Sequence, residues 1–426
     1  MNWRLLVLLL GVTVTVTGAC SSEGRKINAM GSGAGEGGSA KAGAAGIGGT
    51  PDAADAGAGG TPAEPPEGGA AGEGGDGKGP AEPEGGAAGQ GEGGSGGEGG
   101  TAEHYPSITT PSDMTTTLAT AFTLVVQATG SGPLTFSLKS GALPAGILLD
   151  SSTGELSGTT KPAALVSGSV PGRYDLVIRA ANSVGFADTA PFSITVGGVT
   201  LPKPLVYFTY DTADVTATQL NDASGNGHSA TISGGVTTAV SGAVGQAFKL
   251  DGTTGLVQAA GVPTPSGPIS LVATVKPSAL GVGARIPVQY GISDPAPTYR
   301  GNWIQTDSEG HIGGVFEDGV DNGVLSTTTL SVDAFTPVGT TWDDASQVGR
   351  LYVGGLQEGT PVSTAGPLLY ATTNFETGRH PQFAARFWQG SLDEVAMWNV
   401  LLSPEQMATV AWLSKTGQSM KAWIGL

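Results

Sequence analysis

The chain has 426 residues, of which 72 are glycine and 27 are proline, whereas charged residues make up 13% and aromatic residues 6%. Its formal charge of −17 argues against electrostatic binding to nucleic acid or to an anionic membrane surface. One cysteine excludes a disulfide framework and a cysteine-rich zinc site, and four scattered histidines leave little for metal catalysis. These averages combine a segment that cannot form a core with segments that can.

Residues 1–20 (MNWRLLVLLLGVTVTVTGAC) carry one positive charge, then an apolar run, then small residues before Cys20. The apolar run is too short to span a bilayer and is typical of a signal peptide. The segment resembles a bacterial lipoprotein signal, which implies that Cys20 becomes the acylated first residue of the mature protein. Because no aspartate follows Cys20, the resemblance implies the outer membrane, facing the cell surface. An ordinary secretory signal with a chance cysteine is the alternative.

The segment 21–103 is rich in glycine, alanine, glutamate and proline. Between residues 31 and 100 it has no aromatic residue and one large aliphatic residue, Ile47. Such a chain buries too little apolar surface to offset its conformational entropy, so we expect a disordered stalk.

Residues 104–198 contain short runs in which apolar and polar residues alternate, at 134–138, 174–180 and 192–196. This period of two, with turn residues between the runs, predicts an antiparallel β-sandwich. The segments PLTFSLKSGALPAGILLDSSTGELSGTT and PGRYDLVIRAANSVGFADTAPFSITV resemble the immunoglobulin-like domains of bacterial surface proteins. The resemblance implies an immunoglobulin-like domain, here without a cysteine pair.

Residues 200–415 contain further strand-like segments, among them ISLVATVKP and SLDEVAMWN, and one helical segment near the end. Ser403 can cap this helix, Pro404 suits its first turn, and Gln406 completes a capping box. Many strands with one terminal helix in about 210 residues predict a large double-sheet jelly roll.

The motifs of this region also resemble a family. The segment DASGNGHSATISGGVTTAVSGAVGQAFKLDGTTGLVQ is similar to the opening of bacterial laminin-G-like jelly rolls, of the concanavalin A-like lectin and glucanase superfamily. The match resumes at ISLVATVKP and GRLYVGG and ends with FWQGSLDEVAMWNVLLSPEQM. We therefore expect an all-β protein with five segments: signal peptide 1–20, stalk 21–103, immunoglobulin-like β-sandwich 104–198, larger jelly roll with one short C-terminal helix 200–415, and tail 416–426.

Because the superfamily contains glucanases, the sequence has to be tested for catalytic carboxylates. Retaining glycosidases use two carboxylates about 5–5.5 Å apart, which on one strand face means acids two residues apart. The E-x-D-x-E pattern of related glucanases is missing. Asp393 and Glu394 are adjacent, as are Glu317 and Asp318, and adjacent residues of a strand point to opposite faces. We expect a non-catalytic protein, with a glycan-cleaving enzyme as the alternative.

Oxygen-bearing side chains stand at alternate positions of the segment DASGNG, residues 222–227, as at the start of a calcium loop. The twelfth position carries no glutamate, so this is no EF-hand. Many jelly rolls of the superfamily that this segment resembles hold a structural calcium ion, so the resemblance implies one here. The expected ligands are Asp222, Asn226, Asp251 and Asp393. The alternative is that these side chains cap turns and a strand end through the backbone.

A glycan-binding site would use exposed aromatic side chains that stack on sugar rings. We expect Trp303, with Tyr299 and Arg300 beside it, to contact a ligand; packing of Trp303 in the core is the alternative. The sequence thus predicts a secreted protein held at the membrane by a lipid anchor only. Its jelly roll would recognise an extracellular glycan or a surface protein, as in adhesion. A purely structural envelope component is a further alternative.

Overall fold

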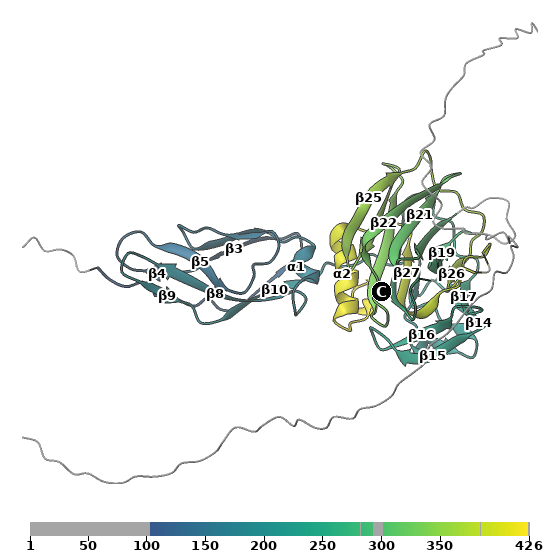
Figure 1. The fold of residues 1–426 in the computed structure, drawn as a ribbon, viewed down its shortest axis with the longest axis horizontal. Coiled ribbons are helices and arrows are strands. Elements are labelled where there is room, and N and C mark those ends of the chain that lie inside the picture. The colour runs from purple at the N-terminus through teal and green to yellow at the C-terminus, as the bar shows by residue number, and fades with distance from the viewer. Residues whose placement is uncertain (1–102, 282, 293–300, 384, 425–426) are drawn as a thin grey trace, which may run out of the picture. The chain divides into compact units, whose positions relative to one another are not determined.

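The computed structural model describes residues 103–281, 283–292, 301–383 and 385–424. These residues form two β-sandwiches that follow each other along the chain (Figure 1). The predicted signal peptide and nearly all of the predicted stalk lie outside the described residues. Among the helices of the described ranges, none is both long and apolar enough to cross a membrane.

The first sandwich consists of short strands whose side chains alternate between core and solvent. Its main sheet has the order β2-β10-β8-β5, with β9 paired to β8, and its second sheet has the order β3-β7-β6. Strands β10 and β2 pair in parallel, and the other pairs are antiparallel. The elements are β1 (Ser107–Ile108), β2 (Met114–Thr117), β3 (Ala121–Val125), β4 (Ala128–Thr129), β5 (Thr135–Ser140), β6 (Ile147–Leu149), β7 (Glu155–Thr159), α1 (Ala163–Val166), β8 (Arg173–Ala181), β9 (Phe186–Asp188) and β10 (Phe192–Gly197).

The second sandwich is larger and ends in a helix, as predicted. Its first strands are β11 (Val206–Phe208), β12 (Val215–Thr216), β13 (Gln219–Leu220), β14 (Ala230–Ser233), β15 (Val236–Ser241), β16 (Gln246–Asp251), β17 (Leu256–Ala259), β18 (Ile269–Pro277) and β19 (Arg285–Tyr290). The later elements are β20 (Asn302–Thr306), β21 (His311–Glu317), β22 (Asp321–Thr329), β23 (Thr336–Asp343), β24 (Val348–Val353), β25 (Leu356–Ser363), β26 (Phe375–Thr377), β27 (Gln389–Trp398) and α2 (Pro404–Lys415). Two 3₁₀ turns complete it, η1 (Thr212–Asp214) and η2 (Met420–Ala422).

Two antiparallel sheets enclose the core of the second sandwich. One has the order β15-β16-β27-β18-β23-β24-β25, with β11 paired to β27, and the other has the order β12-β13-β14-β17-β26-β19-β20-β21-β22. Large side chains from both sheets fill the space between them, among them Phe208, Phe248, Tyr290, Phe316 and Trp342. The predicted all-β class, with an immunoglobulin-like sandwich before a jelly roll, is confirmed.

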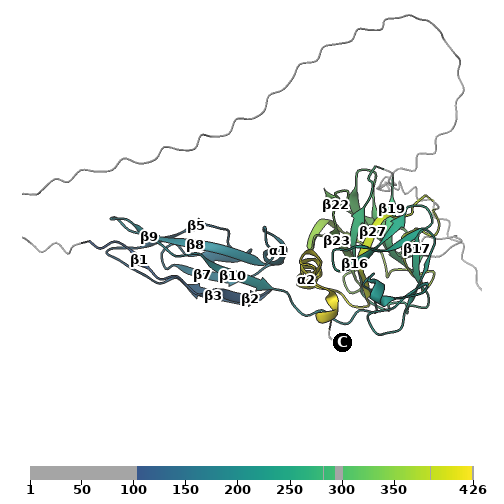
Figure 2. The ribbon, with the colours of Figure 1, turned by 90° about the horizontal axis from the view of Figure 1, so that it is seen from below.

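Helix α2 covers the outer side of the first of these sheets. It packs against β23 and β25, and it lies beside β23 in Figure 2. Ser403 caps it as the sequence predicts, because its hydroxyl accepts the N–H of Gln406 while the Gln406 side chain accepts the N–H of Ser403. Leu402 and Met407, on either side of the cap, lie in one buried cluster.

The same helix contacts the first sandwich. The Lys415 ammonium group donates to the carbonyl oxygen of Val166, at the end of α1, and the Thr409 hydroxyl accepts the N–H of Val199. Ala408 and Ala411 belong to the core cluster of the first sandwich. Helix α2 therefore has apolar contacts on two sides, which explains why it is mostly buried although it ends the fold.

Candidate ligand cleft and cation site

An open cleft lies where the chain enters the jelly roll, beside the loop of residues 222–228. It has a volume of about 350 Å³, within the range of small-molecule sites. Its lining is Lys203, Pro204, Leu205, Asn226, His228 and Asn399. Lys203, Asn226 and Asn399 are exposed and His228 is half-buried. The cleft thus offers an ammonium group, the amide of Asn399, the amide oxygen of Asn226 and an imidazole, and no carboxylate among its lining side chains.

Asp222 and Asn226 fix the loop that forms this cleft. Asp222 Oδ1 accepts the N–H groups of Tyr207 at 3.1 Å and Ser224 at 2.9 Å, and Oδ2 accepts the N–H of His228 at 3.0 Å. Asn226 Nδ2 donates to the carbonyl oxygens of Pro204 and Leu205. These are the backbone contacts of the turn-capping alternative. Calcium binding by Asp222 and Asn226 remains a prediction.

Asp251 lies at the end of β16 and caps a different turn. Its Oδ1 accepts the N–H groups of Thr253, Thr254 and Gly255 at 2.8–2.9 Å, and its Oδ2 accepts both threonine hydroxyls. Burial raises the pKa of Asp251, but these hydrogen bonds outweigh it and hold the pKa below its usual value. Both oxygens of this carboxylate are therefore already well supplied with donors.

Asp393 is in the opposite situation, because it is buried and short of donors. Its Oδ2 accepts the N–H of Val244 at 2.9 Å, whereas Oδ1 has no hydrogen-bond partner. Burial raises the pKa of Asp393 to about 8. The neighbouring Glu394 is also buried, its Oε1 has no partner, and burial raises its pKa to about 7 although the Tyr207 hydroxyl donates to Oε2 at 2.5 Å.

The strict alternation that the sequence suggests for these two acids is wrong. The pairing of β27 with β18 shifts register between Val272 and Thr274, and Glu394 has a φ of +48°. This bulge breaks the alternation of side chains along the strand. Besides burial, the charge of Glu394 contributes to the raised pKa of Asp393.

Several oxygen atoms converge on Asp393 at the turn between β15 and β16. A Cβ placed on Gly242 would lie 2.6 Å from Asp393 Oδ2 and 2.7 Å from the carbonyl oxygens of Val244 and Gln246. Asp211, just after β11, accepts the N–H of Gln246 at 2.7 Å, and its charge also raises the pKa of Asp393. Carboxylate and carbonyl oxygens are the ligands that Ca²⁺ prefers. The surroundings of Asp393 therefore fit the calcium ion that the superfamily resemblance implies.

The four predicted calcium ligands do not form one cluster. A metal site needs at least three ligand atoms close together. Within the described residues, neither Asp222 nor Asp251 nor Asp393 belongs to a group of three His, Cys, Asp or Glu residues whose ligand atoms all lie within 4.8 Å of one another. That arrangement is found instead for Asp307, Glu309 and His311, in the turn between β20 and β21. Asp307 accepts the N–H groups of Glu309 and His311 and contacts the His311 ring at 2.9 Å. These bonds build the turn, so we assign it no ligand.

Trp303 lies on β20 and is 2% exposed. Its ring meets the ring of His380 edge-on at 5.5 Å. It packs with Ile286, Ile292 and Val315. This is the core packing that the sequence left open, and the ring presents almost no surface to solvent. Tyr299 and Arg300 lie outside the described residues, so a glycan contact at this place remains a prediction.

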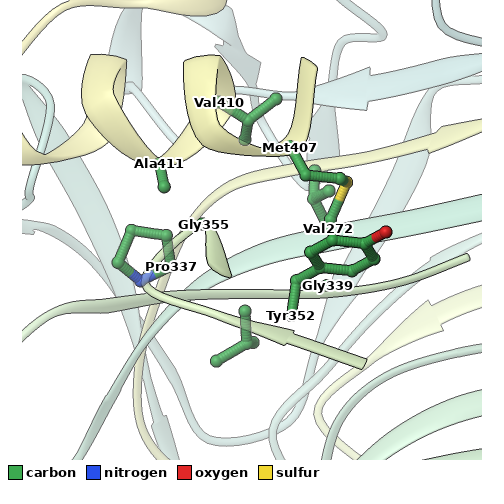
Figure 3. A pocket seen from close by; sticks show the side chains of 9 residues that line it. Val272, Pro337, Gly339, Tyr352, Gly355, Met407, Val410 and Ala411 are labelled. Atoms are coloured by element: carbon green, nitrogen blue, oxygen red, sulfur yellow. The ribbon is translucent and has the colours of Figure 1, made fainter. Parts of the chain in front are cut away.

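A second gap lies beneath helix α2 and is apolar. Figure 3 shows Met407 pointing from the helix toward Tyr352 and Val272 on the sheet. The gap has a volume of about 10 Å³, room for about one water molecule. It is a packing gap between helix and sheet and cannot hold a sugar.

The fold defines a jelly roll preceded by an immunoglobulin-like module. The family model described as "Concanavalin A-like lectin/glucanases superfamily" matches residues 251–408, and the model described as "Putative Ig domain" matches residues 105–197. These two matches confirm the two resemblances over the residues matched. No curated protein sequence matches the chain.

Solved structures that match the chain include a sialidase, a pentraxin and one domain of an arabinanase. A sialidase of Trypanosoma rangeli is 12% identical with a TM-score of 0.40, covering 58% of this chain and 44% of its own. A pentraxin of Limulus polyphemus is 14% identical with a TM-score of 0.29, covering 34% and 69%. Domain 4 of the arabinanase AbnA of Geobacillus stearothermophilus, solved with arabinotriose, is 20% identical with a TM-score of 0.36, covering 49% and 98%. The chain spans less than half the length of the sialidase.

Proposed function

We propose that the jelly roll recognises an extracellular glycan without cleaving it. The observation that supports this most is the open cleft lined by Lys203, Asn226, His228 and Asn399. Amide, ammonium and imidazole groups donate hydrogen bonds to sugar hydroxyl and ring oxygens, and Pro204 and Leu205 offer apolar surface beside them. Such a mixture of a few polar groups with apolar surface is typical of small-ligand sites.

The positions of the carboxylates support the proposal that the jelly roll does not cleave its ligand. Glycoside hydrolysis by the usual route needs two carboxyl groups that flank the scissile bond. No carboxylate lines the cleft. Asp393, Glu394 and Glu317 are each 3% exposed or less, so a polysaccharide does not reach them in this structure. A carbohydrate-binding role fits this distribution better than the glycan-cleaving alternative, and a surface protein as the ligand would have to enter the same cleft.

Presentation at the cell surface completes the proposal. Acylation of Cys20 would anchor the chain in the outer membrane, since each buried CH₂ of an acyl chain gains roughly 0.8 kcal/mol. The glycine-rich segment 21–103 would then carry the immunoglobulin-like domain and the jelly roll away from the membrane.

We further propose that calcium stabilises the jelly roll at Asp393. The carboxylate has one oxygen without a donor, and a bound cation would remove the cost of keeping it ionised in the interior. Asp211 and the carbonyl oxygens of Val244 and Gln246 are the nearest further candidates as ligands. Asp222 and Asp251 are weaker candidates, because backbone N–H groups already occupy their oxygens.

A glycan array probed with the full chain in calcium-containing buffer tests the binding function. We expect binding to a subset of polysaccharides with no release of sugar. Asn399→Ala should weaken it about fivefold, because one hydrogen bond contributes about 1 kcal/mol. The control is Gln219→Ala, an exposed amide on β13 outside the cleft. Absence of binding to every glycan, or equal binding by both variants, would contradict the proposed site.

A further inference from the structure

We propose that the cleft is built for an oxyanion carried on a sugar, so that the ligand is an acidic polysaccharide rather than a neutral one. This inference rests on the proposed glycan-binding function and narrows it. It depends on Lys203, whose charge a neutral sugar does not need.

Lys203 is an exposed cation without an acidic partner. None of the ion pairs among the described residues includes it, although Lys139, Lys421, Arg173, Arg179 and Arg379 each bind an aspartate or glutamate. A lysine that stays unpaired in a cleft without carboxylates is therefore available to an anion from outside.

The ammonium group of Lys203 lies on the side of the cleft that the loop of residues 222–228 forms. Its Nζ atom lies 3.9 Å from the place that a Cβ would take on Gly225, so the ammonium group lies over the turn of residues 222–228. Gly225 has a φ of +76°, a conformation that favours glycine. Because no side chain rises from this position, the ammonium group, the His228 ring and the Asn399 amide face one open space.

The carboxylate of this turn, Asp222, already has donors of its own. Asp222 accepts the N–H groups of Tyr207, Ser224 and His228, and these three bonds use both of its oxygens. An oxyanion in the cleft would thus meet an ammonium group, an amide N–H and an imidazole, a set of donors that suits a carboxylate or a sulfate. The two groups share this chemistry, and the choice between them is a matter for experiment.

Measuring the binding of the full chain to three polymers separates these cases. Polygalacturonate carries carboxylates, dextran sulfate carries sulfates, and dextran is neutral. We expect binding to at least one acidic polymer and weaker or no binding to dextran, with the affinity falling as salt is raised. The negative net charge repels both acidic polymers, so non-specific attraction does not explain a positive result. Binding to polygalacturonate alone assigns a carboxylate, and binding to both assigns either oxyanion.

Lys203→Gln and Lys249→Gln are the matched pair of variants. Both lysines are exposed, but Lys249 lies on β16 outside the cleft. Lys203→Gln should weaken binding to the acidic polymer about three- to fivefold, as expected for one exposed ion pair, and Lys249→Gln should leave it unchanged. Equal effects of the two variants, or equal binding of dextran, would overturn the inference. If neutral glycans still bind and Asn399→Ala weakens them, the proposed function survives without it; if no glycan binds, the proposed function itself fails.

Discussion

Replacing Asp393 with asparagine removes the most costly carboxylate of the jelly roll. Burial raises its pKa from 3.8 to about 8, and each pKa unit is worth about 1.36 kcal/mol. Without metal, the contribution of the protonated acid to stability is fully present below pH 4 and is lost as the pH rises toward 8. At pH 7 the loss is on the order of 4 kcal/mol. Asparagine has no charge to bury, so we expect the variant to be more stable than the metal-free wild type at neutral pH.

Chemical unfolding with chelator at pH 5, 6, 7 and 8, followed by tryptophan fluorescence, measures this effect. The free energy of unfolding of the wild type should fall across this range. That of Asp393→Asn should fall less, by the contribution of Asp393, while the buried Glu394 and Glu317, whose pKa values burial also raises, contribute to both curves. Calcium at a hundredfold excess over its dissociation constant should return about 2.7 kcal/mol to the wild type and nothing to the variant. Asp251→Asn is the control, because the pKa of Asp251 is lowered and its contribution is instead lost as the pH falls. Parallel curves for the wild type and Asp393→Asn would refute the reasoning.

Three further outcomes follow from the structure. Gly242→Ala should lower the free energy of unfolding by about 1–3 kcal/mol, because its methyl group would lie within 2.7 Å of three oxygens, whereas Gly267→Ala, with no atom within 4 Å, should be neutral in the same assay. Ser403→Ala should cost about 1 kcal/mol in denaturant unfolding, through loss of the α2 cap. Cys20→Ser should release the protein from the membrane fraction or stall its processing, and unchanged retention with normal processing would contradict the lipid anchor.

The first sandwich was predictable because most of its strands, β10 excepted, bury one face only. The run at 174–180 becomes β8, whose side chains alternate between buried and exposed positions. The two-residue period of the sequence therefore reports the fold directly. Helix α1 was not predictable in this way. Its four residues are too few to show a helical period, and its position depends on the helix of another sandwich that packs against it.

The capping box of α2 was equally predictable from the sequence, since Ser403 and Gln406 contact each other within one turn. The cleft was not, because its lining comes from three separate segments: residues 203–205 before β11, the loop at 226–228 and Asn399 after β27. Only the register of β11 against β27 brings the first and last of these together. The bulge at Glu394 could not be predicted from the sequence either, because two adjacent acids in a strand are expected to point to opposite faces.

The calcium prediction shows what decides between a turn cap and a metal ligand. An aspartate followed by small polar residues supplies the same oxygen atoms for either role, so the pattern DASGNG predicts both. What separates them is how many N–H donors the fold turns toward the carboxylate and how much water it excludes. Asp222 and Asp251 each accept at least three backbone N–H groups, and a cation would have to displace these donors. Asp393 is fully buried with one oxygen unpartnered, so its ionised form is unfavourable until a cation arrives. Among aspartates that look alike in the sequence, the one with the fewest donors and the least solvent is therefore the better candidate for a metal ligand, and the unfolding experiment with calcium tests it.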